Sequence, residues 1–212
     1  MKTIILLFLL FSVFQNTGNA TEWTLKKENN NLKIYTATVA NSDYKSVKVE
    51  CTVTAKFTQV IAALFDIDRQ HEWVYNDKES KLLKQVSENE LIYYSEVSVP
   101  WPCTNRDFIA HLKVTQSSPA VVSIASHAEP DFLPQKDGIV RVKSSSAQWT
   151  LTAIGNNQVK IDYIMQFDPS GSVPAWLTNM FVTKGPFETF DKLQSRINLP
   201  AYQNVHYDFI KD

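Results

Sequence analysis

This sequence has few glycines, few cysteines and almost no net charge. Its 212 residues include five glycines and two cysteines, and the formal net charge is −1. No glycine-rich phosphate loop and no Gly-x-Ser-x-Gly turn occurs, which disfavours nucleotide binding and covalent serine catalysis. Lysines are interspersed with acidic residues and form no basic run, so we expect no nucleic-acid partner. Cys51 and Cys103 could pair in an oxidising compartment or remain two free thiols.

Metal-binding motifs are missing as well. The four histidines, His71, His111, His127 and His206, include no pair at the helical spacing of a metal site. His111 and His127 could meet across neighbouring strands, although a hydrogen-bonded structural histidine gives the same pattern. The sequence therefore predicts no metal ion, no cofactor and no catalytic residue.

The N-terminus has the layout of a secretory signal peptide. Lys2 precedes an apolar run from Ile4 to Phe14, and small residues lie before a cut after Ala20. The run is shorter than the roughly 20 residues of a membrane-spanning helix, although an uncleaved N-terminal anchor is the alternative. We expect residues 1–20 to be the signal peptide and residues 21–212 to be one domain with its core over about 23–199. The protein is then exported to the periplasm or the extracellular space.

Alternation of apolar and polar residues dominates the chain up to residue 167. This period of two is typical of half-buried strands in an antiparallel sheet. Asn41-Ser42-Asp43, Glu88-Asn89-Glu90 and Gly155-Asn156-Asn157 separate some of them as turns. The predicted strands are Leu32–Val39, Ser46–Val53, Ser80–Val86, Leu91–Val99, Asp107–Thr115, Val121–Ala128, Val140–Leu151 and Val159–Phe167.

Helical periodicity occurs in three places. Thr58 could cap a short helix from Gln59 to Phe65, and a second short helical stretch is expected from Arg69 to Tyr75. After Pro174, apolar residues recur at the spacing of an amphipathic helix. Gly185-Pro186 lies inside this last pattern, so we expect a kink or break around Val182 to Gly185.

These patterns predict an α+β fold of the helix-grip type, a curved antiparallel sheet wrapped around a long C-terminal helix. Such an arrangement leaves room for a cavity between the sheet and the helix. A closely packed α+β domain would show the same alternation, so the pattern alone leaves the cavity open.

Three stretches resemble the START family, the lipid-transfer domain related to steroidogenic acute regulatory protein. They are Phe65–Trp73, which ends in an acidic residue and tryptophan, Tyr94–Phe108, with a proline-containing loop before Arg-Asp-Phe, and Asp168–Leu177, before the C-terminal helix. The resemblance covers about Trp23 to Leu199 and suggests an exported bacterial member. It implies a tunnel that holds one lipid-like molecule. Sterol-binding relatives carry an arginine where Leu112 stands here, so this chain lacks one polar anchor for a sterol.

Strand alternation gives a candidate lining for that tunnel. Core packing is the plainer reading of each residue, but Tyr93 and Tyr163 are the better candidates because a buried phenol needs a hydrogen-bond partner. Arg106 either meets a ligand headgroup or forms an ion pair with Asp107 or Glu96. The expected ligand-binding residues are Tyr93, Val97, Arg106, Phe108, Ala110, Leu112, Trp149, Tyr163, Met165, Phe167, Trp176, Met180 and Phe187.

The sequence thus favours a monomeric, non-enzymatic carrier of a lipid or another hydrophobic small molecule. Trp101, between two prolines, is either an exposed aromatic that makes transient membrane contact or a buried loop anchor. A rival function is a helix-grip enzyme, a cyclase or hydrolase that acts on a hydrophobic substrate in the same cavity. His111 with Asp107 or Glu129 inside the cavity would favour that rival. A third possibility is an exported sensor or assembly factor whose own side chains fill the cavity.

Overall fold

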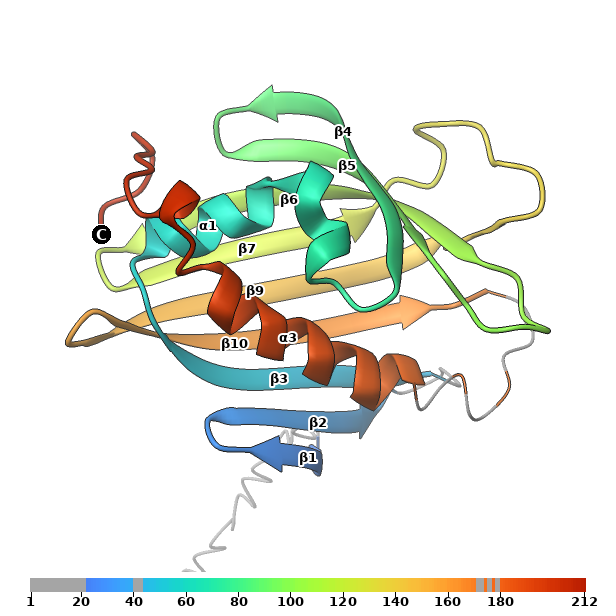
Figure 1. Ribbon diagram of the computed structural model, residues 1–212, viewed down its shortest axis with the longest axis horizontal. Helices are drawn as coiled ribbons and strands as arrows, with labels where there is room; N and C mark the ends of the chain where they lie inside the picture. The colour runs from blue at the N-terminus through green and yellow to red at the C-terminus, as the bar shows by residue number, and fades with distance from the viewer. Residues whose placement is uncertain (1–21, 40–43, 171–173, 175–176, 178–179) are drawn as a thin grey trace, which may run out of the picture.

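The computed structural model describes residues 22–39, 44–170, 174, 177 and 180–212. These residues form one strongly curved sheet with helices on its concave side (Figure 1). The fold is therefore the expected α+β helix-grip arrangement. The expected signal peptide, the Asn41-Ser42-Asp43 turn and Trp176 lie outside the described residues.

Nine strands follow one another across the sheet in the order β1-β2-β3-β10-β9-β7-β6-β5-β4, each antiparallel to its neighbour. The short strand β8 pairs with β6 in parallel. Their bounds are Thr24–Asn29 (β1), Leu32–Thr38 (β2), Lys45–Thr54 (β3), Asp77–Ser87 (β4), Glu90–Val97 (β5), Arg106–Ser118 (β6), Val121–Ala128 (β7), Val140–Arg141 (β8), Ser144–Gly155 (β9) and Gln158–Asp168 (β10).

Strand β10 shows why the sequence forms this sheet. It pairs with β3 on one side and β9 on the other, so it joins the first three strands to the rest. Val159 and Ile161 are buried, and Lys160 between them faces the other way. Asn156 and Asn157 both have positive φ angles, as a two-residue turn between twisted strands requires.

Two details of the strand prediction were wrong. The predicted strand Val140–Leu151 is divided, because β8 ends at Arg141 and β9 begins at Ser144. Strand β1 was not predicted, because all its side chains are exposed at the edge of the sheet and show no alternation.

Both cysteines are free, and burial raises the pKa of the Cys51 thiol to about 12.

The helical segments are α1 (Phe57–Phe65), the 3-10 helix η1 (Ile67–Glu72), the π-helical turn η2 (Met180–Lys184), α3 (Gly185–Arg196) and the 3-10 helix η3 (Pro200–Tyr202). Thr58 does not cap α1, because the helix begins at Phe57 and its N-cap residue is Lys56. Thr58 instead donates from its backbone N–H and its hydroxyl to Asp212. The expected stretch Arg69–Tyr75 lies partly in η1, which ends at Glu72.

Helix α3 crosses the concave side of the sheet (red in Figure 1). The irregularity expected near Gly185 is present as a change from π-helix to α-helix at that residue, with Pro186 in the first turn of α3. The helix packs on the sheet through Phe190 and Leu193, which are almost fully buried. It therefore closes the space that the sheet curves around.

Candidate functional site

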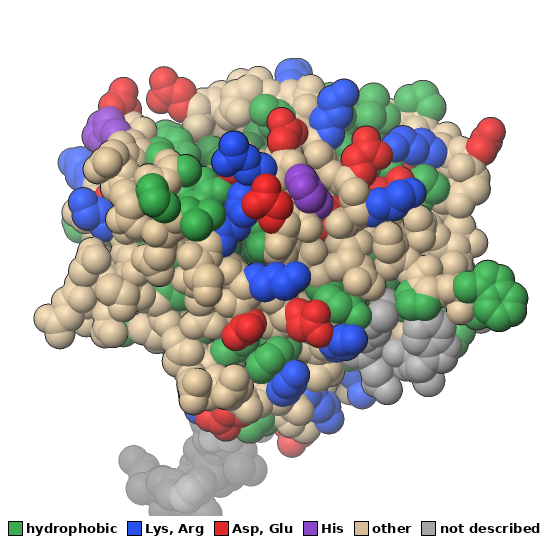
Figure 2. Space-filling view, viewed as in Figure 1, with side chains coloured by type: hydrophobic (Ala, Val, Ile, Leu, Met, Phe, Trp, Pro, Cys, Tyr) green, Lys and Arg blue, Asp and Glu red, His purple; other side chains and the backbone are tan. Residues whose placement is uncertain are grey.

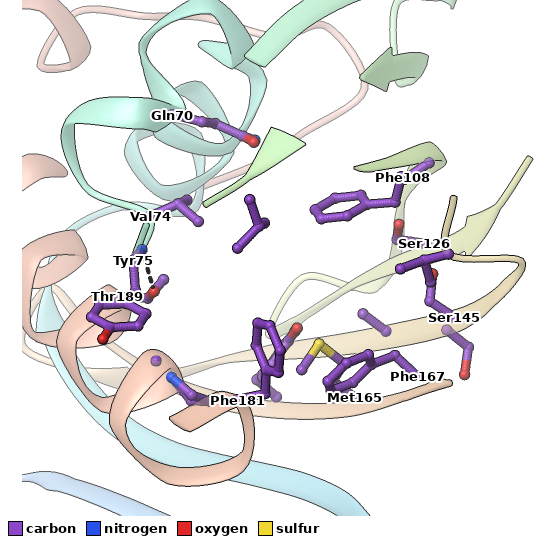
Figure 3. Close-up of a pocket in the computed structure, with 18 of the residues that line it drawn as sticks. Gln70, Val74, Tyr75, Phe108, Ser126, Ser145, Met165, Phe167, Phe181 and Thr189 are labelled. Carbon is purple, nitrogen blue, oxygen red and sulfur yellow. Dashed lines mark hydrogen bonds between the residues drawn. The ribbon is translucent and has the colours of Figure 1, made fainter. Parts of the chain in front are cut away.

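A cavity of about 240 Å³ lies between the concave face of the sheet and α3. Gln70 and Phe108 lie on one side of the space, and Met165 and Phe167 lie on the opposite side (Figure 3). The lining comes from strands β5, β6, β7, β9 and β10, from α1, from η1 and the residues after it, and from η2 and α3. The fold thus leaves a pocket between the sheet and α3.

Aromatic rings form one wall of the cavity. Trp149 and Tyr163 are direct partners in the β9–β10 register, and their ring centroids are 4.5 Å apart. The Phe190 ring of α3 stacks on Trp149 at 5.0 Å and lies 5.2 Å from Tyr163. Rings at these separations attract one another beyond their buried area. This cluster fastens the helix to the sheet and gives the cavity a rigid apolar wall.

Two phenols supply hydroxyl groups inside this apolar space. Burial raises the pKa of Tyr93 to about 12 and moves the pKa of Tyr163 still further from its ordinary value. Both phenols are therefore neutral at physiological pH. Neither hydroxyl is hydrogen-bonded to a side chain or backbone group in the described ranges. They can donate to, or accept from, a polar group of a ligand.

Arg106 is the only charged residue among the described residues that line the cavity. It is 6% exposed, and its guanidinium donates to two backbone carbonyls, Thr104 at 2.5 Å and Pro169 at 3.4 Å. The expected ion pair with Asp107 or Glu96 was wrong. No carboxylate in the described part of the chain lies at ion-pair distance from Arg106.

The two acids have other partners. Asp107 accepts two hydrogen bonds from the Arg141 guanidinium, at 2.8 and 3.1 Å, and both side chains are almost completely buried. Arg141 also donates to the carbonyls of Pro130, Leu133 and Pro134. This pair anchors β8 and the loop before it. Glu96 accepts from Lys78 and Asn105, both at 2.8 Å.

Trp73 provides a further polar group on the cavity wall. Its side chain is 3% exposed, and its indole Nε1 has no hydrogen-bond acceptor among the described residues. A buried N–H without an acceptor is costly. Near it, the backbone N–H of Tyr75 donates to Thr189 Oγ1 of α3 at 3.0 Å, the bond drawn in Figure 3. That bond ties the residues after η1 to the helix.

Of the predicted lining residues that the structure describes, only Phe187 is absent from the cavity wall. Its ring centre lies 3.5 Å from Lys27 Nζ, and the lining from α3 is Gly185, Pro186, Thr189 and Phe190. Trp176 and the side chain of Met180 lie outside the described residues. The predicted residues that line the cavity are Tyr93, Val97, Arg106, Phe108, Ala110, Leu112, Trp149, Tyr163, Met165 and Phe167.

Sequence reasoning missed the lining that comes from the first helical region. Leu64, Gln70, Trp73 and Val74 all line the cavity. For Gln70 and Trp73 the signal was present in the family-like stretch Phe65–Trp73. A 3-10 segment has no long periodic face, so the pattern did not show which side chains turn inward.

The loop between β5 and β6 carries an unusually exposed aromatic side chain. Trp101 is 91% exposed and follows Pro100, and the Trp101–Pro102 peptide bond is cis. Of the two expected states, the structure has the exposed one. Asn105 closes the loop by accepting from the backbone N–H of Val99 and donating to Glu96. The loop projects from one end of the sheet (green, at the right in Figure 1).

The pair that would favour an enzyme does not converge inside the cavity. His111 Nδ1 lies 3.7 Å from Glu129 Oε1, but alternation on β6 places His111 on the face opposite Ala110 and Leu112, which line the cavity. Asp107 lies on that same outer face, paired with Arg141.

None of the described helices is long and apolar enough to cross a membrane. Acidic and basic side chains are interspersed over the face in Figure 2.

Comparison with known proteins agrees with this architecture. Residues 12–201 match the family model of the START domain. An uncharacterized protein of Pseudomonas aeruginosa is 31% identical over 189 residues, which cover 88% of this chain and 93% of that protein. The phosphatidylcholine transfer protein of Mus musculus is 27% identical over 171 residues, or 77% of this chain and 78% of that protein.

Solved structures give the same result. The crystal structure of a STAR-related lipid transfer protein fragment from Xanthomonas axonopodis superposes with a TM-score of 0.77 at 31% identity, covering 84% of this chain and 99% of that one. An aromatase/cyclase from Streptomyces superposes with a TM-score of 0.51 at 11% identity, covering 72% and 92%. The second likeness is one of fold alone.

Proposed function

We propose that this chain, which belongs to the START domain family, binds one lipid-like molecule in the cavity under α3 and carries or presents it without changing it chemically. The observation that carries this proposal is the cavity between the sheet and α3, with an aromatic wall and few polar groups. Each Å² of apolar ligand surface taken out of water contributes about 25 cal/mol. A hydrophobic guest is therefore favoured there over solvent.

The size of the cavity supports a slim guest. Its volume of about 240 Å³ lies just below the roughly 300–1,000 Å³ of typical small-molecule sites. In this closed form the cavity suits a single hydrocarbon chain better than the two chains of a phospholipid. A larger lipid would require α3 to move outward.

The polar groups of the cavity suggest how the guest is oriented. Arg106 lies at the start of β6, beside Pro169 at the end of β10, so its charge is at one end of the space. A carboxylate or phosphate placed there would provide the negative charge that this buried cation lacks. The Tyr93 and Tyr163 hydroxyls would hydrogen-bond to a second polar group farther along. We therefore favour an amphiphile with an anionic head.

Catalysis is the rival, and the described lining offers little for it. Its polar members are Arg106, tyrosines, serines, Gln70, Thr189 and the Trp73 indole, with no carboxylate or imidazole among the described residues. General acid–base catalysis uses a titratable pair within reach of the substrate. A carrier needs only complementary shape and a few hydrogen-bonding groups, which is the set present.

Uptake and release would occur at the N-terminal end of α3. The C-terminal end is held by Arg196, which donates to Glu72 at 2.6 Å. The N-terminal end of α3 follows directly on the π-helical turn η2. Such turns are common at functional sites. The exposed Trp101 at the same end of the sheet as Arg106 would make transient contact with a bilayer. We propose that the protein does this as an exported monomer.

Filling the cavity tests this function. Ala110 lines it and is 3% exposed, so Ala110→Trp places an indole in the ligand space. Ala125 is exposed on the outer face of β7, so Ala125→Trp is a matched control. We expect Ala110→Trp to abolish binding and intervesicle transfer of a fluorescent fatty acid, and Ala125→Trp to leave both unchanged. Leu112→Phe, a smaller change, serves if Ala110→Trp fails to fold. Equal transfer by all the folded variants would refute the proposal.

A further inference from the structure

Two histidines and a glutamate converge on the outer face of the sheet, away from the cavity. His111 on β6 and His127 on β7 are direct register partners, with ring centroids 4.9 Å apart. Glu129 lies two residues after His127, so strand alternation keeps it on the same face. One ligand atom from each of the three residues lies within 4.8 Å of the other two.

The separations suit a small divalent metal ion. Glu129 Oε1 lies 3.1 Å from His127 Nε2 and 3.7 Å from His111 Nδ1. In a tetrahedral zinc site with bonds of about 2.0–2.1 Å, neighbouring ligand atoms are about 3.3 Å apart. The ligand nitrogens of the two imidazoles lie within 4.8 Å of each other, so the rings must move closer together for all three residues to bind one ion.

A second carboxylate supports the far side of His111. Glu90 on β5 lies with its Oε1 2.6 Å from His111 Nε2, at ion-pair distance although not in hydrogen-bond alignment. Lys113 holds the other oxygen of Glu90 at 3.1 Å. A carboxylate behind a ligating histidine fixes the ring and leaves its other nitrogen free for the metal. Here that free nitrogen is Nδ1, the one that faces Glu129.

The backbone also holds the three groups in place. The N–H of Glu129 donates to the carbonyl of Ile109 at 2.8 Å, which continues the β6–β7 pairing past the end of β7. Two of the ligands come from paired strands of the same sheet and the third from this extension. Rigid elements reduce the cost of ordering a site when an ion binds.

We propose that His111, His127 and Glu129 form a binding site for one divalent transition-metal ion, with Zn²⁺ as the ion that fits best. Two imidazoles and one carboxylate are a ligand set that zinc accepts in proteins, with water in the fourth position. The site lies on the opposite side of the sheet from the ligand cavity. It fastens β6 to β7 and does not depend on what the cavity binds.

Isothermal titration of the tag-free protein with ZnCl₂ tests the site. We expect one ion to bind per chain. His127→Ala should abolish this binding, and its fold should be intact because the side chain is 57% exposed. Glu90→Gln should weaken the affinity about 10–100-fold, as loss of a supporting carboxylate does. His206→Ala is the control, since His206 is exposed and its one ion-pair partner within the described ranges is Asp208.

Titration with Co²⁺ gives a second readout, because the visible spectrum of bound Co²⁺ reports the coordination geometry. A tetrahedral spectrum in the wild type that is absent from His127→Ala and from Glu129→Gln is the expected result. Wild-type binding no stronger than that of His127→Ala, with either ion, would overturn the proposal. So would equal losses in His127→Ala and His206→Ala, because these would indicate independent surface histidines.

Discussion

Arg196, the last residue of α3, donates a hydrogen bond from Nη1 to Glu72 Oε2, at the end of η1, over 2.6 Å. Its Nη2 lies 3.4 Å from Asp66 Oδ2, and Tyr202 donates to the same oxygen at 2.6 Å. This cluster joins the end of the closing helix to the segment that follows α1. It makes the C-terminal end of α3 the fixed end.

Loss of the Arg196 guanidinium should loosen that attachment. The side chain is 6% exposed, so we expect Arg196→Met to lower the free energy of unfolding by roughly 1–3 kcal/mol. It should also speed lipid exchange. Urea unfolding and an intervesicle transfer assay measure the two effects. Arg69→Met is the control, because Arg69 is exposed and 3.7 Å from Asp66. If the two variants had the same stability and the same exchange rate, the anchoring role would be contradicted.

Arg106 should discriminate between ligands by charge. We expect Arg106→Met to weaken binding of a fatty acid roughly 10–100-fold, since a hydrogen bond to a charged group contributes about 1.5–3 kcal/mol. Binding of the matching fatty alcohol should change little. Lys113→Met, which removes a cation from the outer face, should affect neither ligand. An equal loss for acid and alcohol would mean that Arg106 only holds the two backbone carbonyls.

Asp77 should make stability depend on pH. Burial raises its pKa, although Ser95 Oγ donates to one carboxylate oxygen at 2.7 Å. A raised pKa in the folded state means that protonated Asp77 stabilises the fold, and this contribution is lost as the pH rises through that pKa. The free energy of unfolding of Asp77→Asn, relative to that of the wild type, should therefore be higher at pH 7 than at pH 4. Unfolding curves at the two pH values measure the gain, and Asp131→Asn on an exposed turn is the control. A difference that does not change with pH would contradict the assignment.

Trp101 should act at the membrane and not in the fold. Because it is 91% exposed, Trp101→Ala should change the free energy of unfolding by no more than about 0.5 kcal/mol. The rate of lipid transfer to vesicles should fall several-fold. Ile154→Ala is the control, at the β9–β10 end of the sheet and 50% exposed. Equal transfer rates for the two variants would exclude a special role for Trp101.

Much of the sheet could be predicted because alternation is a local signal. Val121–Ala128 was predicted with the bounds that the structure has, and the β9–β10 turn was visible in Gly155-Asn156-Asn157. The alternation of β6 also placed Phe108, Ala110 and Leu112 on one face, which is the face that lines the cavity.

Contacts between distant residues could not be predicted in the same way. The partner of Asp107 is Arg141, on a two-residue strand with no pattern of its own. Phe187 belongs to the apolar stripe of α3, but the rotation of that helix on the sheet turns Phe190 inward and leaves Phe187 against Lys27. Helical spacing defines a stripe and not which of its members reaches a cavity.

Native mass spectrometry of the protein isolated from its own host, with extraction of whatever co-purifies, tests the account most directly. The account predicts one bound amphiphile per chain, with a single hydrocarbon chain and an anionic head, in the wild type and in Ala125→Trp but not in Ala110→Trp. A wild-type protein that carries nothing and gains no mass from an excess of fatty acid or phospholipid would contradict it.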